Sequence, residues 1–133
     1  MPKSYVIVAK TRARFEDVVD VVGKINDASS IHAEYFDCAT KAAVFIGEKY
    51  FFRTFSWASA VTIIKDLGGE VVIRIVTTGG GGGLLNVDYG ANKSYAWNIL
   101  DNIKNRLAVE VIKEIDNYNV SMRKSTFLPG EET

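Results

Sequence analysis

The spacing of hydrophobic residues changes twice along the first part of the chain, and each change marks a new element. The apolar run SYVIVA at residues 4–9 predicts a short strand. From Phe15 onward, apolar residues follow the i, i+3, i+4, i+7 spacing of an amphipathic helix, which predicts a helix over residues 13–27. The polar segment NDASS then ends this helix.

The middle of the chain is rich in residues that favour strands. The pair Gly68–Gly69 separates two such runs and predicts a hairpin. Gly47 lies inside another run and is a candidate for a β-bulge. The predicted strands of this region cover residues 31–38, 41–55, 57–65 and 70–78.

A long helix over residues 91–117 is the last predicted element. Its apolar positions recur every three or four residues, as in an amphipathic helix. They are Ala96, Leu100, Ile103, Leu107, Val111 and Ile115. Residues 1–120 are therefore predicted to form a single α+β domain, and residues 121–133 a loosely ordered C-terminal tail.

The predicted element order is β-α-β-β-β-β-α. Strands linked by hairpins form a mostly antiparallel sheet, here of about four or five strands. Two helices that bury their apolar stripes on such a sheet give a two-layer α+β sandwich. The alternative is a helix-grip fold, in which a curved sheet wraps the long C-terminal helix and leaves a cavity.

The predicted strands are apolar on both faces. Over residues 70–78, Val71 and Ile73 lie on one face, whereas Val72 and Val76 lie on the other. Two helices cover only one face, so the second face needs another cover. This pattern predicts self-association, most simply as a two-fold homodimer. The alternative is that the C-terminal tail, or a curled sheet, covers the second face.

Composition narrows the functional classes. The 133 residues include 16 Lys and Arg and 16 Asp and Glu, and this zero net charge argues against dedicated nucleic-acid binding. No apolar run approaches the about 20 residues of a membrane span, and the N-terminal region lacks a signal-peptide pattern, so a cytoplasmic protein without membrane binding is expected. One cysteine, Cys38, and one histidine, His32, give no metal-ligand cluster, so no metal or cofactor is expected.

A run of five glycines is the most unusual motif. The phosphate-loop and dinucleotide patterns both fail, because no lysine follows the run and leucines occupy the position of the last glycine. Consecutive glycine N–H groups can still bind an anion, and the start of the next helix can add N–H groups and a lysine. The alternative is a flexible connection or a close backbone contact. The predicted site residues are Gly79, Gly80, Gly81, Gly82, Gly83, Gly90, Lys93 and Ser94.

The predicted strand over residues 41–55 contains a dense aromatic cluster interrupted by charges. One interpretation makes it the wall of an apolar ligand pocket, with Glu48 or Arg53 as the polar anchor. The alternative is a core strand with solvated charges at its rim. No spacing places two carboxylates together for acid–base chemistry, so no catalytic residue is predicted and a non-enzyme is favoured.

Three segments occur in a fixed order around a hairpin of apolar strands. They are EKYFFR at 48–53, GGGGG at 79–83, and DYGA at 88–91 before a long helix. In this order and spacing, about residues 15–107 resemble an uncharacterised family of small microbial proteins, known only as a domain of unknown function. The resemblance implies an intracellular protein without assigned activity and transfers no catalytic residue. It also implies that the aromatic strand, the glycines and Gly90 form one constellation.

The sequence therefore predicts a small intracellular binding or interaction domain. The domain is expected to form a homodimer and to carry a pocket for a small anionic or apolar ligand at the glycine-rich loop. One alternative is an enzyme that acts on a small anionic substrate. The other is a lipid- or acyl-binding helix-grip protein.

Overall fold

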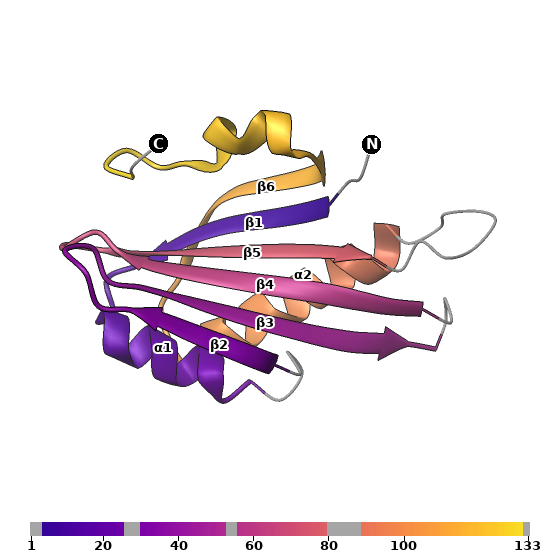
Figure 1. Ribbon diagram of the computed structural model, residues 1–133, viewed down its shortest axis with the longest axis horizontal. Coiled ribbons are helices and arrows are strands. Elements are labelled where there is room, and N and C mark those ends of the chain that lie inside the picture. The colour runs from indigo at the N-terminus through magenta and orange to yellow at the C-terminus, as the bar shows by residue number, and fades with distance from the viewer. Residues whose placement is uncertain (1–3, 26–29, 53–55, 80–88, 132–133) are drawn as a thin grey trace.

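The computed structural model describes residues 4–25, 30–52, 56–79 and 89–131. These residues form one antiparallel sheet, two α-helices and one 3-10 helix (Figure 1). In chain order the elements are β1 (Ser4–Thr11), α1 (Phe15–Gly23), β2 (Ser30–Phe36), β3 (Ala42–Phe51), β4 (Ser56–Asp66), β5 (Val71–Gly79), α2 (Tyr89–Lys104), β6 (Glu110–Tyr118) and the 3-10 helix η2 (Val120–Thr126).

The sheet has six strands in the order β2-β3-β4-β5-β1-β6, and every neighbouring pair is antiparallel. Strands β2 to β5 form a meander of consecutive strands, and β1 lies between β5 and β6. The predicted α+β class with an antiparallel sheet is confirmed. The predicted count of four or five strands is wrong, because β6 adds a sixth.

The predicted helix over residues 91–117 is wrong beyond Lys104, where α2 ends and the chain turns into β6. The apolar residues of this region fit an extended chain as well as a helix, because Leu107, Val109 and Val111 follow one another at a spacing of two and pack on one face. A register shift in the β1–β6 ladder places Val111 on the face that carries the helices. Ile112 and Ile115 pack on the opposite face. β-Branched residues of this kind favour strands.

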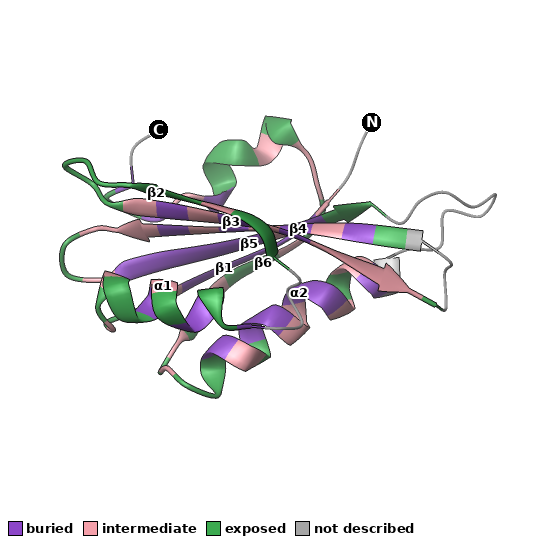
Figure 2. Ribbon diagram, turned by 60° about the horizontal axis from the view of Figure 1, so that its bottom comes forward, coloured by how far each residue is buried: buried purple, intermediate pink, exposed green. Residues whose placement is uncertain are grey.

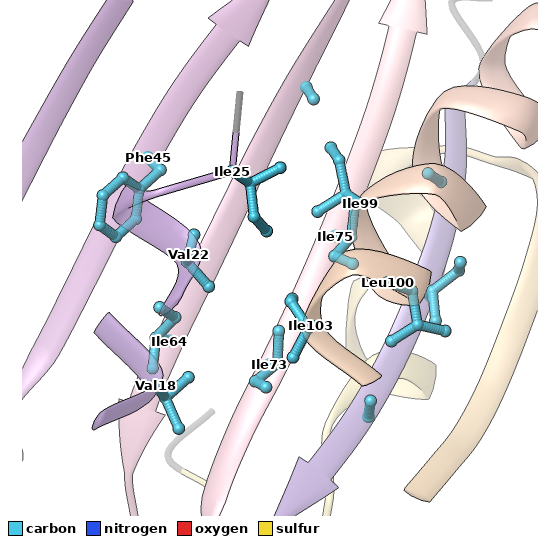
Figure 3. Packing of buried hydrophobic residues seen from close by; sticks show 14 of the residues in the cluster. Val18, Val22, Ile25, Phe45, Ile64, Ile73, Ile75, Ile99, Leu100 and Ile103 are labelled. Atoms are coloured by element: carbon cyan, nitrogen blue, oxygen red, sulfur yellow. The ribbon is translucent and has the colours of Figure 1, made fainter. Parts of the chain in front are cut away.

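Helices α1 and α2 pack on the same face of the sheet (Figure 2). Val18 and Val22 of α1 and Ile99 of α2 are buried against the central strands (Figure 3). Ile73 and Ile75 of β5 form the floor of this core. This arrangement confirms the two-layer sandwich. Helix α1 is shorter than the predicted 13–27, because it ends at Gly23.

The second face of the sheet is covered in part by the C-terminal strap, which we define as residues 120–131. Leu128 of the strap packs with Val6, Val8 and Val72 in a second, smaller cluster over β1 and β5. The strap begins with η2, where the Asn119 side chain accepts a hydrogen bond from the Ser121 N–H. Thr126, Leu128 and Glu131 of the strap are buried, whereas most of its other residues are exposed. The predicted loose order of residues 121–133 stays a prediction.

The remainder of the second face lies over β3 and β4. Val44 and Ile46 of β3 and Val61 and Ile63 of β4 are directly paired across these strands and only partly buried. None of the four belongs to either core cluster. The strap thus covers the part of the apolar second face over β1 and β5, whereas the part over β3 and β4 is only partly buried in the described structure.

Candidate functional site

The first glycine of the run, Gly79, ends β5 and has a φ of 99°. A Cβ atom added there would lie 3.1 Å from the backbone oxygen of Trp57 on the neighbouring strand. Glycine is therefore needed at this position by the backbone, whatever the rest of the run does. The other four predicted glycines, Gly80 to Gly83, lie outside the described residues, so the predicted anion pocket stays a prediction.

Replacing Gly79 with alanine is expected to lower the free energy of unfolding by about 1–2 kcal/mol, because an L residue is strained at this φ. Gly69 is the matched control, since a Cβ atom there meets nothing within 4 Å and its φ is not in the left-handed range. Urea unfolding of both variants measures the difference. If Gly79→Ala and Gly69→Ala were equally stable, the backbone at position 79 would not require glycine.

The predicted residues of the next helix lie in the first turns of α2. Gly90 is the second residue of this helix, and Ser94 follows one turn later. Lys93 is exposed, and its Nζ lies 3.9 Å from the Glu114 carboxylate of β6. The lysine proposed for an anion therefore already faces a carboxylate. Asn92, beside it, has a buried Oδ1 atom without a hydrogen-bond partner.

The polar residues of the predicted aromatic strand are placed unequally. Glu48 lies in β3, paired with Ser59 of β4, and is partly exposed. Burial, and to a smaller extent the charge of Glu48, raises the pKa of Tyr95 on α2 to about 12. The structure shows no hydrogen bond or ion pair between Glu48 and Lys93 within its described ranges. Arg53 lies outside the described residues.

A buried ion pair that the sequence did not predict holds the strap on the sheet. Arg74, on β5, is 5% exposed, and its guanidinium donates hydrogen bonds to Glu131 Oε2 at 2.6 Å and to the Thr126 carbonyl oxygen at 2.7 Å. Lys65 Nζ lies 3.1 Å from Glu131 Oε1, and the Phe127 ring lies 5.2 Å from the Arg74 guanidinium. We call these four side chains, Arg74, Glu131, Lys65 and Phe127, the strap clamp.

Burial raises the pKa of Glu131, but the hydrogen bonds from Arg74, the Leu128 N–H and Lys65 outweigh this effect and lower it overall. A lowered pKa in the folded state means that the ionised carboxylate stabilises the protein above the ordinary glutamate value of 4.5. This stability is lost as the pH falls through the lower folded-state value. The strap clamp is therefore an acid-sensitive contact.

Wild-type protein is expected to be more stable than Glu131→Gln at neutral pH, and this advantage should disappear progressively below about pH 4.5. Thermal unfolding of both proteins at a series of pH values checks the prediction. A stability difference that is the same at pH 7 and pH 3 would show that the Glu131 charge does not stabilise the strap.

Two adjoining clefts lie where β1 ends, with volumes of about 630 Å³ and 580 Å³. They share Arg12 and Glu70 as lining residues. Lys10 also lines the larger cleft, and its Nζ lies 3.6 Å from the Glu70 carboxylate. Glu110 completes the mixture of charges. Because both positively and negatively charged side chains line the two clefts, the clefts favour neither an anion nor a cation as a ligand.

Exposed large hydrophobic residues gather at one side of the sheet. Strand β2 carries Ile31, Tyr35 and Phe36, which are 65%, 61% and 44% exposed. At the end of the β3–β4 hairpin, Phe52 is 80% exposed and Trp57 is 59% exposed. We call the outer side of β2 the β2 edge. Since large apolar side chains concentrated in one region mark interaction sites, this region is the candidate functional surface.

The aromatic residues at the end of the hairpin contact one another. Tyr50 packs against Phe52 and Trp57 with ring centroids 5.3 Å and 5.4 Å apart, in edge-to-face arrangements. These contacts fix the orientation of three large rings at the end of β3 and β4. The aromatic strand predicted as a pocket wall thus presents part of its cluster to solvent.

No group of three or more His, Cys, Asp or Glu side chains that could hold a metal ion occurs among the residues with a described position. Within the same ranges, no helix has both the length and the apolar character needed to cross a membrane.

No protein-family model matches the chain, and no curated protein sequence matches it significantly. The resemblance to a family of small microbial proteins therefore stays a prediction.

Proposed function

We propose that this protein is an interaction domain that acts as a homodimer. Its interface is the side of the sheet that carries the β2 edge, and its partner is a second copy of the chain. Five of the six large hydrophobic residues that are exposed in the described structure lie on β2 or at the end of the β3–β4 hairpin. This concentration is the observation that carries the proposal.

The position of β2 in the sheet supports the same conclusion. β2 is the first strand in the sheet order, so it has a strand neighbour on one side only. Edge strands present unpaired N–H and C=O groups to other chains, and natural proteins usually shield them with charges or cover them. Three of the six exposed residues of β2 are instead large and apolar. A second copy would cover these side chains and satisfy the free backbone groups together.

Replacing Ile31 with lysine is expected to raise the dissociation constant of the dimer by about tenfold or more, which corresponds to about 1.4 kcal/mol. Lysine on an edge strand opposes pairing. The fold should tolerate the change, because Ile31 is 65% exposed. Sedimentation equilibrium over a range of protein concentrations measures the dissociation constant.

Val120→Lys is the matched control, because Val120 is an exposed apolar residue on η2, away from the β2 edge. This variant should associate like the wild type. If Ile31→Lys also keeps the wild-type dissociation constant, or if both variants lose association equally, the proposed interface is wrong.

A further inference from the structure

The two edges of the sheet differ in how they are protected. The outer strand β6 has charged residues at four of its nine positions, and charges on an edge strand discourage pairing with other chains. The outer strand β2 has one carboxylate, one histidine and three exposed large hydrophobic residues among its seven positions. Within the described chain no strand lies beyond β2 in the sheet. The β2 edge is therefore the edge that is suited to pairing.

We propose that β2 of one protomer pairs antiparallel with β2 of a second copy, about a two-fold axis that passes through Ala33 perpendicular to the sheet. This inference rests on the proposed function, because it names the contact by which the two copies associate. The two sheets become one continuous sheet, and the helices of both copies lie on the same side of it.

The order of side chains along β2 points to this register. Residues directly opposite one another in an antiparallel pair lie on the same face. An axis through Ala33 therefore places His32 opposite the partner's Glu34, both within the regular part of the β2 ladder. Within one chain, His32 Nε2 and Glu34 Oε1 are 3.3 Å apart and both side chains are more than half exposed. His32 and Glu34 thus share a face and are accessible to a partner, and their pairing occurs twice across the axis.

Neighbouring registers are less favourable. An axis through Glu34 would bring two carboxylates directly opposite one another, and like charges in this position are destabilising. An axis through His32 would place Glu34 opposite the partner's Ser30 and leave the carboxylate without a cationic or histidine partner. Among these registers, the axis through Ala33 alone pairs Glu34 with histidine.

Disulfide trapping tests the pairing. In a Cys38→Ser background, which removes the only cysteine, Ala33→Cys should form a disulfide-linked dimer on mild oxidation. Directly opposite Cα atoms are about 4.5–5.5 Å apart in an antiparallel pair, within the range that a disulfide spans. Asp116→Cys, on the exposed edge strand β6, is the control and should remain largely uncrosslinked. A circular-dichroism melt confirms that each variant folds.

The register is tested by mixing His32→Cys and Glu34→Cys proteins of different mass, both in the Cys38→Ser background. Both positions are exposed, so neither change should disturb the fold. The mixed disulfide should form in clear excess over the two homodimeric disulfides. A dominant Glu34→Cys homodimer would overturn the register.

The two proposals fail in distinguishable ways. If the wild type has a dimer mass but Ala33→Cys crosslinks no more than Asp116→Cys, β2 pairing is wrong. The protein is then still a homodimer, but its interface is another surface. If the wild type is a monomer, both proposals are wrong.

Discussion

Glu131→Ala is expected to lower the free energy of unfolding by about 3–5 kcal/mol, the usual effect of removing one partner of a buried ion pair. Arg74 is nearly fully buried on a central strand, and its hydrogen-bond partners among the described residues, Thr126 and Glu131, both belong to the strap. Without the carboxylate, the guanidinium would stay buried in an apolar face with its charge uncompensated. Chemical denaturation of the purified variant measures the loss.

Glu110→Ala is the matched control, because Glu110 is an exposed glutamate without an ion pair in the described structure, and its loss should have little effect. A second variant separates charge from packing. Arg74→Met combined with Glu131→Leu removes both charges and should be close to the wild type in stability or above it, since apolar replacement of a buried pair is often neutral or stabilising. Unchanged stability of Glu131→Ala would contradict the strap clamp.

Ile99→Ala is expected to lower the free energy of unfolding by about 2–5 kcal/mol. Ile99 is fully buried between α2 and the sheet, where it lies beside Ile75 in the same core cluster (Figure 3). The substitution removes buried apolar surface and leaves a cavity. The surrounding side chains and the strand β5 relax to fill this cavity only in part. Urea unfolding of the variant, monitored by circular dichroism, measures the loss.

Asp101→Ala is the control for this prediction, because Asp101 lies on the exposed side of the same helix. It should unfold near the wild-type urea concentration. If Ile99→Ala were as stable as Asp101→Ala, α2 would not be anchored on the sheet through this face. The Ile99 variant should also keep the self-association of the wild type. Helix α2 packs mainly on β5, which is separated from β2 by β3 and β4 in the sheet.

The sequence predicted the first five strands and α1 at close to their observed positions, because local spacing decides them. The sequence-based prediction was wrong at β6, where it gave a helix. The apolar residues from Leu107 to Ile115 fit the spacing of a helix, and they also fit the spacing of a strand that contains one register shift. Only the position of β1 in the sheet decides between the two. Its free edge offers a ladder of hydrogen bonds to β6, and this ladder is a tertiary effect that no local pattern reveals.

The contacts of the strap are also tertiary and could not be predicted from local sequence patterns. Arg74 and Glu131 are 57 residues apart in the chain, and nothing in either local sequence links them. The one available signal was an arginine in an otherwise apolar strand, VVIRIV, where a charge needs a partner. The prediction that a second face needs cover was based on the apolar faces of this strand and of the strand over residues 41–55, and the strap provides part of that cover over β1 and β5.

The candidate surface could be anticipated only in part. The sequence predicts a strand over residues 31–38, but it does not reveal that this strand lies at an edge. The dimer was predicted from the apolar second face, whereas the contact that we propose is the β2 edge. The difference arises because sheet order, which decides which strands are edges, depends on where β1 inserts.

Multi-angle light scattering of the wild type at micromolar concentration tests the homodimer most directly. A two-fold dimer gives twice the 14.7 kDa mass of one chain, with a shift towards 14.7 kDa only on strong dilution. A mass of 14.7 kDa at every concentration up to the millimolar range would contradict the proposal.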